Sequence, residues 1–265
     1  MPVILKGGQR PEGEQDKLMT NAHGKQGVGK STFALTHPSP LFYFNCDRPM
    51  GKLLEMLPDS YEIVYEAIPL DVDTITPGLA AQYMAKFDAL VNQALKRGEG
   101  TFVVDGIDIF CEIVKVAKLP KSSGEAIPRE YADYNTYFNN HHRRLGVSGL
   151  QICTTAMSKP VWTGAKTETD MMQSEGFKWR GRWITTEIYM FTPENCDTPH
   201  ATPVEGQRGH THMTWISTSK LNEKLVGAVI PGLTFGLLYR MTFGKNYPDA
   251  AKLYSPTKEK QEAAA

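Results

Sequence analysis

One glycine-rich segment constrains this chain more than any other feature. Residues 24–31 read Gly-Lys-Gln-Gly-Val-Gly-Lys-Ser, which matches the pattern G-x-x-x-x-G-K-[ST]. Glycines let successive backbone N–H groups curl around an anion, and a helix that begins near Lys30 directs its positive end at the same point. The pattern therefore predicts a phosphate-binding loop, although a glycine-rich turn could match it by chance.

The residue types of this loop predict its ligand, which we expect to be ATP with Mg²⁺. The Lys30 ammonium should reach the β and γ phosphates, and the Ser31 hydroxyl should bind Mg²⁺. The expected nucleotide-binding residues are Gly24, Lys25, Gln26, Gly27, Val28, Gly29, Lys30, Ser31 and Thr32. The helix should run to Leu35 and end before Pro38. The strand expected before the loop, residues 18–22, is more polar than a buried strand usually is.

A second motif is the apolar run Thr101-Phe102-Val103-Val104, which ends in Asp105. Such a strand carries its carboxylate to the edge of the sheet where phosphates bind in open α/β folds. Asp105 is therefore the expected metal ligand, directly or through water, and Asp108 is the alternate. An aspartate here could also simply cap the helix that follows.

A third carboxylate, Asp47, follows the apolar strand Leu41–Asn45. At this position it could orient or deprotonate an attacking water. It could equally be a turn residue before Pro49.

Composition and periodicity indicate one large α/β domain. Strands expected at 41–44, 101–105 and 150–155 alternate with helices at 78–97 and 130–145, which favours a mainly parallel sheet flanked by helices. Strands expected at 183–191 and 212–217 lie closer together, so the C-terminal end is expected to be antiparallel. We expect a flexible leader at 1–17, the domain at 18–245 and a tail at 246–265.

The charge balance and the cysteines exclude some classes of protein. Lys and Arg total 29 and Asp and Glu total 29, so a globally basic nucleic-acid binder is not indicated. The four cysteines form no C-x-x-C pair, and no apolar run approaches the ~20 residues that span a bilayer. We therefore expect a cytoplasmic protein, in the host cytoplasm if a phage encodes it.

These motifs together resemble the RecA-like P-loop ATPases over roughly residues 18–242. The likeness is greatest to the phage-type branch linked to single-strand annealing and recombination, the AAA-type phage nucleotide-binding proteins. The resemblance implies that the acidic residue after the second strand, here Asp47 where the family usually has Glu, is the catalytic base. It also implies a polar sensor after the fourth strand, here Thr155. The expected catalytic residues are Lys30, Asp47, Asp105 and Thr155.

In RecA-like folds the segment after the sensor strand lines the DNA path, and here it is the long polar segment from Ser158 to Arg182. Its end interleaves cations with aromatic rings, which suits single strands because cations neutralise phosphates and rings stack on bases. The expected nucleic-acid residues are Lys178, Trp179, Arg180 and Arg182. Trp179 and Trp183 could instead belong to the core of the next strand.

Other clusters favour structural roles. Cys196, His200, His210 and His212 match no familiar zinc spacing. His141 and His142 are expected at the surface of a helix, and Tyr131, Tyr134 and Phe138 in the core. Lys220 and Lys224 are candidates for a contact across a subunit interface.

The sequence thus predicts an ATP-binding and ATP-hydrolysing protein that acts on single-stranded DNA in phage-type recombination, annealing or replication. It should form a homo-oligomer, either a ring or a filament. The alternatives are a small-molecule kinase or motor ATPase without DNA binding, and a nucleotide-gated assembly module that hydrolyses little. ATPase assays with and without single-stranded DNA separate these functions.

Overall fold

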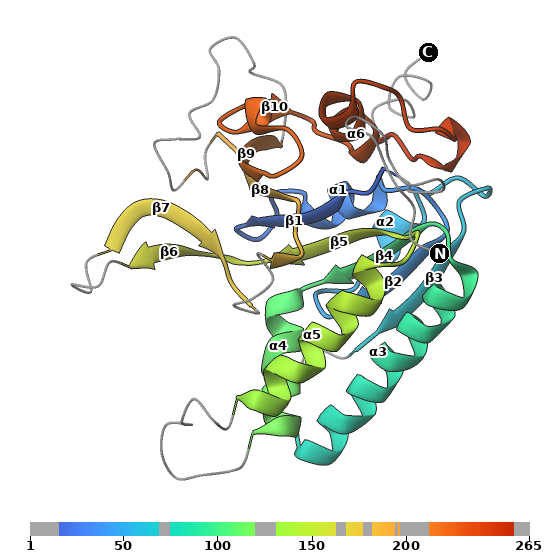
Figure 1. The fold of residues 1–265 in the computed structure, drawn as a ribbon, viewed down its shortest axis with the longest axis vertical. Helices are drawn as coiled ribbons and strands as arrows, with labels where there is room; N and C mark the ends of the chain where they lie inside the picture. The colour runs from blue at the N-terminus through green and yellow to red at the C-terminus, as the bar shows by residue number, and fades with distance from the viewer. Residues whose placement is uncertain are drawn as a thin grey trace, which may run out of the picture.

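The computed structural model describes residues 16–68, 75–119, 131–162, 168–176, 182–193, 196 and 212–256. Over these residues the chain forms an eight-stranded sheet in the order β10-β9-β8-β1-β5-β4-β2-β3, together with a separate β6–β7 hairpin (Figure 1). The strands are β1 (Met19–Gly24), β2 (Leu41–Asn45), β3 (Ile63–Ala67), β4 (Thr101–Asp105), β5 (Gln151–Ala156), β6 (Ser158–Trp162), β7 (Glu168–Ser174), β8 (Thr186–Phe191), β9 (Met213–Ser219) and β10 (Val229–Pro231).

The predicted fold class is confirmed. The pairs that join β8, β1, β5, β4, β2 and β3 are all parallel, whereas β9 pairs antiparallel with both β8 and β10. Because the strands from β3 to β8 run in one direction, their carboxyl ends meet at one edge. That edge holds the loop after β1 and the carboxylates that follow β2 and β4.

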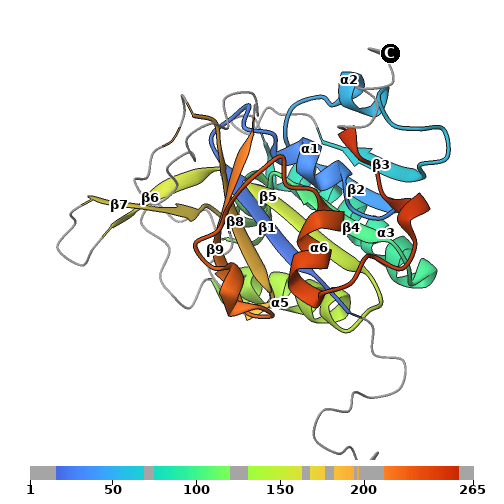
Figure 2. The ribbon, with the colours of Figure 1, turned by 90° about the horizontal axis from the view of Figure 1, so that it is seen from above.

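Helices cover both faces of the sheet (Figures 1 and 2). They are α1 (Lys30–Leu35), α2 (Gly51–Leu54), α3 (Pro77–Arg97), α4 (Ile107–Lys118), α5 (Ala132–Gly146) and α6 (Phe235–Phe243), with short 3₁₀ turns η4 (Glu223–Leu225) and η5 (Ala250–Lys252). Side chains from α3, α4 and α5 pack in one apolar cluster, and those from α1 and α6 pack in the other. The sheet is therefore the middle of three layers.

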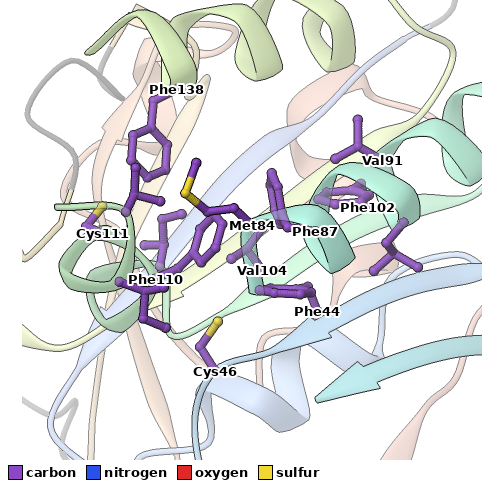
Figure 3. Close-up of a cluster of buried hydrophobic side chains, with 14 of the residues drawn as sticks. Phe44, Cys46, Met84, Phe87, Val91, Phe102, Val104, Phe110, Cys111 and Phe138 are labelled. Carbon is purple, nitrogen blue, oxygen red and sulfur yellow. The ribbon is translucent and has the colours of Figure 1, made fainter. Parts of the chain in front are cut away.

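The α3–α5 side of the core is built from aromatic rings (Figure 3). Phe87 of α3 is 3% exposed, and its ring centroid lies 5.1 Å from that of Phe44, 5.6 Å from Phe102 and 4.5 Å from Phe110. Phe44 and Phe102 come from β2 and β4, and Phe110 comes from α4. Phe87 therefore joins α3 to the strands that carry the candidate carboxylates.

We expect Phe87→Ala to lower the free energy of unfolding by about 3–5 kcal/mol, because it removes a buried ring and leaves a cavity. Gln93→Ala is the matched control, since Gln93 is exposed on the same helix. Urea unfolding followed by circular dichroism measures both. Equal stability of the two variants would contradict the central position of Phe87.

The polar character of β1 has a structural reason. The Asn21 side chain donates to Glu187 Oε1 at 3.1 Å and accepts from Thr154 Oγ1 at 2.8 Å. Thr20 Oγ1 lies 3.1 Å from His37 Nε2. Buried polar side chains are tolerated when they are hydrogen-bonded, so β1 can lie inside the sheet between β5 and β8.

Three expectations differ from the structure. The strand expected from Trp183 begins at Thr186, and the first part of the expected polar segment forms the β6–β7 hairpin. The expectation that His141 and His142 lie at the surface was wrong, because both are buried. His141 Nε2 lies 2.9 Å from Asp88 Oδ1, and His142 Nδ1 lies 2.8 Å from the Phe138 carbonyl. Tyr134 and Phe138 are buried in the core, as predicted, and Tyr131 packs against it.

Candidate functional site

The glycine-rich loop joins the end of β1 to the start of α1, and three of its glycines are required by geometry. Gly27 and Gly29 have φ of 79° and 89°, in the region that disfavours side chains. At Gly24 an added Cβ would lie 2.2 Å from the carbonyl oxygen of Met190 in β8, and at Gly29 it would lie 2.9 Å from the His212 ring. The loop is thus seated closely against the sheet.

Lys30 folds back over this loop. Its Nζ donates to the carbonyls of Gly24 and Lys25 at 2.9 and 2.8 Å and lies 3.7 Å from Met157 Sδ. Burial lowers the pKa of Lys30, and the nearby carboxylates Asp47, Asp105 and Asp108 act in the opposite direction. The ammonium is therefore held at the loop, surrounded by three acidic groups.

A cavity of about 270 Å³ opens beside Lys30 at the carboxyl edge of the sheet. Its walls include Gln26 and Lys30 from the loop, Asp47 and Arg48 after β2, and Asp108 at the start of α4. Thr155 and Met157, near and just after the end of β5, also line it. The site residues expected from β1, β2 and β5 thus meet at one cavity.

Asp105 lies behind this wall and is 1% exposed. Its Oδ2 accepts a 2.6 Å hydrogen bond from the Tyr43 hydroxyl, and its Oδ1 accepts one from the Thr155 hydroxyl. Thr155 Oγ1 in turn accepts from the Gly106 N–H at 2.9 Å, and Ser31 hydrogen-bonds to Tyr43. Ser31 and Asp105, the two expected metal ligands, are therefore bridged by one phenol.

Tyr43 had not been singled out from the sequence. It lies within the apolar strand β2 and reads there as a core residue, and it is indeed fully buried. Burial raises the pKa of its hydroxyl, and the adjacent Asp105 carboxylate raises it further. The phenol therefore stays protonated and donates its proton to Asp105.

Asp108 differs from Asp105 because it lines the cavity. Its Oδ2 accepts from the Met157 N–H at 3.1 Å. Burial raises the pKa of Asp108, and hydrogen bonds from the N–H groups of Met157, Asp108 and Ile109 offset part of this effect. The aspartate that bonds the first turn of α4 is therefore Asp108, whereas Asp105 bonds to side-chain hydroxyls.

Asp47 lies in a braced turn at the cavity wall and is partly exposed. Its N–H donates to Asn45 Oδ1 at 2.9 Å, and its Oδ1 accepts from the Arg48 N–H at 2.8 Å. Asn45 Nδ2 also donates to the Arg48 carbonyl and to the Tyr65 hydroxyl. Asp47 is therefore both a turn residue and part of the cavity wall. Arg48, a cation on this wall, had not been singled out from the sequence.

The β6–β7 hairpin is attached directly to this site and projects from the body of the molecule (Figures 1 and 2). The Met157 carbonyl accepts from the Glu175 N–H at 2.9 Å, which closes the base of the hairpin. His23 Nδ1, at the end of β1, lies 2.8 Å from Ser158 Oγ. The base of the hairpin therefore contacts the loop strand, Asp108 and Lys30.

Most of the predicted nucleic-acid residues lie outside the described residues, namely Lys178, Trp179 and Arg180. Arg182 is described and exposed. Trp183 packs at the margin of the α3–α5 cluster, where its ring is stacked 6.3 Å from that of His142. Lys220 and Lys224 are both exposed.

The zinc alternative is only partly covered by the structure, because His200 and His210 lie outside the described residues. Within the described ranges, no three His, Cys, Asp or Glu side chains are placed to hold a metal ion together. Across the same ranges, none of the helices has the length and apolar character needed to cross a bilayer.

Comparison with known proteins gives matches to solved structures alone: no family model matches the chain, and no curated protein matches it. The chain is similar to EscN, the ATPase of the type III secretion system of enteropathogenic E. coli, with 13% identity and a TM-score of 0.43 over 66% of this chain and 43% of EscN. It is also similar to a prototypical type III secretion ATPase of pathogenic bacteria, with 11% identity and a TM-score of 0.41 over 66% of this chain and 52% of that one.

A third similar structure is a KaiC-like protein from the archaeon Pyrococcus horikoshii OT3, with 13% identity and a TM-score of 0.37 over 77% of this chain and 79% of that one. The chain spans about half, or less, of the length of the two secretion ATPases.

Proposed function

We propose that the protein is a RecA-like P-loop ATPase that depends on Mg²⁺, with residues 18–245 as its catalytic domain. The observation that carries this proposal is the position of Lys30, held over a glycine loop at the wall of a cavity formed by the ends of β2, β4 and β5. The strand order supports it further, because β5 lies between the loop strand β1 and the Asp105 strand β4. Thr155 at the end of β5 can therefore bond Asp105.

The loop and α1 would bind the triphosphate. The N–H groups of the glycine loop would donate to phosphate oxygens, and the Lys30 ammonium would exchange the carbonyls of Gly24 and Lys25 for the β and γ phosphates. This exchange preserves the hydrogen bonds of the ammonium while adding charge attraction.

Ser31 and Asp105 fit a Mg²⁺ ion. A hydroxyl and a carboxylate are the hard oxygen ligands that Mg²⁺ prefers, and one or two carboxylates suffice when phosphates and water complete the shell. Both groups contact the Tyr43 hydroxyl, so they lie close enough to act on one ion. When bound, Mg²⁺ would neutralise charge on the phosphates. Asp47, partly exposed at the wall, would orient or deprotonate the attacking water.

We further propose that the protein acts on single-stranded DNA, in recombination, annealing or replication of the phage type, as a ring or filament of identical subunits. The β6–β7 hairpin supports this, since its base contacts Lys30 through Met157 and β1 through Ser158. Movement of Lys30 onto a phosphate would alter the contact with Met157. Residues 178–182 follow this hairpin in the chain, so nucleotide could favour one arrangement of the DNA-binding segment.

Binding of single-stranded DNA is expected to require ATP or a non-hydrolysable analogue and to weaken steeply with salt. Replacing Lys178, Arg180 and Arg182 together with alanine should abolish DNA binding but preserve ATP binding at the loop. Trp179→Ala should weaken DNA binding with little change in its salt dependence, because stacking carries no charge. The anisotropy of a labelled oligonucleotide, titrated with and without nucleotide, measures all of these effects.

The matched control replaces three exposed cations elsewhere, Lys52, Lys96 and Arg240, with alanine. If the Lys178, Arg180 and Arg182 variant binds like the parent, that segment is not the DNA surface. If the parent binds no oligonucleotide under any nucleotide condition, the DNA function is wrong and another class of P-loop enzyme replaces it.

A further inference from the structure

A second cavity, of about 610 Å³, lies between α3 and α5 and shares no lining residue with the cavity at Lys30. The two helices lie side by side on one face of the sheet (Figure 1). We call this cavity the α3–α5 groove. It is lined by Asp88 and Asn92 of α3, by Tyr137, Asn140, His141, Arg143 and Arg144 of α5, and by Val147.

The open wall of the groove carries positive charge. Arg143 and Arg144 are both exposed, and Arg144 Nη2 donates to Asn92 Oδ1, which fixes its direction. Among the described residues, Arg143 makes no ion pair. Guanidinium groups bind phosphate and carboxylate with paired hydrogen bonds, so two adjacent ones suit an anionic ligand.

Asp88 is the only acid among the lining residues that the structure describes; its side chain is 44% exposed, and its carboxylate is bonded by side chains of α5. Its Oδ1 accepts 2.9 Å hydrogen bonds from the Tyr137 hydroxyl and from His141 Nε2. These donors come from α5 and join it to α3. The amides of Asn92 and Asn140 add neutral N–H donors at the wall.

The groove suits a sugar–phosphate backbone better than a base. The Tyr137 ring packs near the rings of Phe87 and Phe138, at centroid distances of 6.4 and 5.6 Å, as part of the core margin. Stacking on a base is therefore not the interaction that this wall provides. Val147, 83% exposed at the rim, gives an apolar contact suited to a sugar.

The segment expected to bind nucleic acid also contacts α5, through Trp183 against His142 and Gly146. Trp183 packs on α5, where its ring would lie 3.3 Å from a Cβ built on Gly146. Arg182 immediately precedes Trp183 and is exposed. Cations therefore occur both at the groove and where residues 182–183 contact α5.

We propose that the α3–α5 groove binds the phosphodiester backbone of a nucleic-acid strand, with Arg143 and Arg144 pairing with phosphates and the Asn92 and Asn140 amides as additional donors. This inference rests on the proposed function in DNA binding and names a further surface for it. The contact is independent of base sequence, because each of these groups binds the backbone.

The test compares Arg143→Gln/Arg144→Gln with the control Lys52→Gln/Arg240→Gln, whose exposed side chains lie on α2 and α6. Anisotropy of a labelled single-stranded oligonucleotide is titrated over a series of salt concentrations, with an ATP analogue present. The groove variant should bind more weakly, and its plot of log affinity against log salt should flatten by about 1.4, since each lost phosphate contact removes about 0.7 from the slope for single strands.

ATP turnover without DNA should be unchanged in both variants, because neither pair lines the Lys30 cavity. Oligonucleotides of different sequence should lose affinity equally. If the parent binds DNA and the groove variant binds it with the same slope, the groove inference fails while the proposed function stands. If the binding of labelled poly-glutamate depends on Arg143 and Arg144 and the binding of DNA does not, the groove binds an acidic protein and the inference is overturned. If the parent protein binds no DNA, the proposed function in DNA binding is itself wrong.

Discussion

Lys30→Ala is expected to lower ATP turnover by at least about 100-fold, the size of effect seen when one preorganised charge or donor is removed from a reacting group. In the structure the Lys30 ammonium hydrogen-bonds to the carbonyls of Gly24 and Lys25 and is 7% exposed. Alanine removes the main cation expected at the β and γ phosphates. Nucleotide affinity should therefore fall together with turnover.

The measurement combines phosphate release with titration of a fluorescent ATP analogue. Lys30→Arg is the control that keeps the charge, and it should retain more nucleotide affinity than alanine because the guanidinium can still contact phosphate. Thermal unfolding without nucleotide should show that the alanine variant is folded. If a folded Lys30→Ala protein has the turnover and nucleotide affinity of the parent, the nucleotide does not bind at this loop.

Asp105→Asn is expected to lower Mg²⁺-dependent turnover strongly while preserving the fold and much of the nucleotide binding. The Asp105 carboxylate is buried and accepts from the hydroxyls of Tyr43 and Thr155. Asparagine matches its shape, and the two hydroxyls can rotate to suit an amide. The lost negative charge is what a metal ion needs, so we expect about 100-fold lower turnover at saturating nucleotide, by the same electrostatic argument.

Asp108→Asn is the matched variant for this measurement, since Asp108 lies three residues further along and lines the cavity itself. Turnover is measured against Mg²⁺ concentration for both variants, with nucleotide affinity determined separately. If Asp108→Asn is inactive and Asp105→Asn behaves like the parent, Asp108 is the metal ligand and Asp105 has a structural role. Asp105 is buried behind the cavity wall, whereas Asp108 lines the cavity, so the comparison decides which of the two carboxylates the metal ion requires.

The elements that the sequence could predict are those with strong local signals. The strand at 101–105 and the long helix of α3 were found within a residue or two, because an apolar run and a clear helical spacing define them. The loop and Asp47 meet at one cavity, as the shared carboxyl edge of parallel strands favours, and Thr155, which the resemblance to RecA-like ATPases implies, lines the same cavity.

Contacts between distant residues could not be predicted in the same way. Tyr43 reads as core in its own strand, and its bond to Asp105 depends on the pairing of β2 with β4. The burial of His141 depends on Asp88 in another helix, which no pattern within α5 reveals. The β6–β7 hairpin was missed because its strands are polar and lack the apolar alternation expected of a strand with one buried face.

The pairing of β1 has a consequence for the order in which the chain can fold. Met19 pairs with Ile152 and Thr20 with Thr186, so the first strand finds its neighbours only after most of the domain has left the ribosome. Contacts so distant in sequence form slowly, and an apolar strand left unpaired meanwhile is prone to aggregate. The polar side chains of Thr20 and Asn21 would make the unpaired strand more compatible with water. In the folded protein, Glu187 and Thr154 bond to Asn21. The polarity of β1 would then serve the nascent chain as well as the finished sheet.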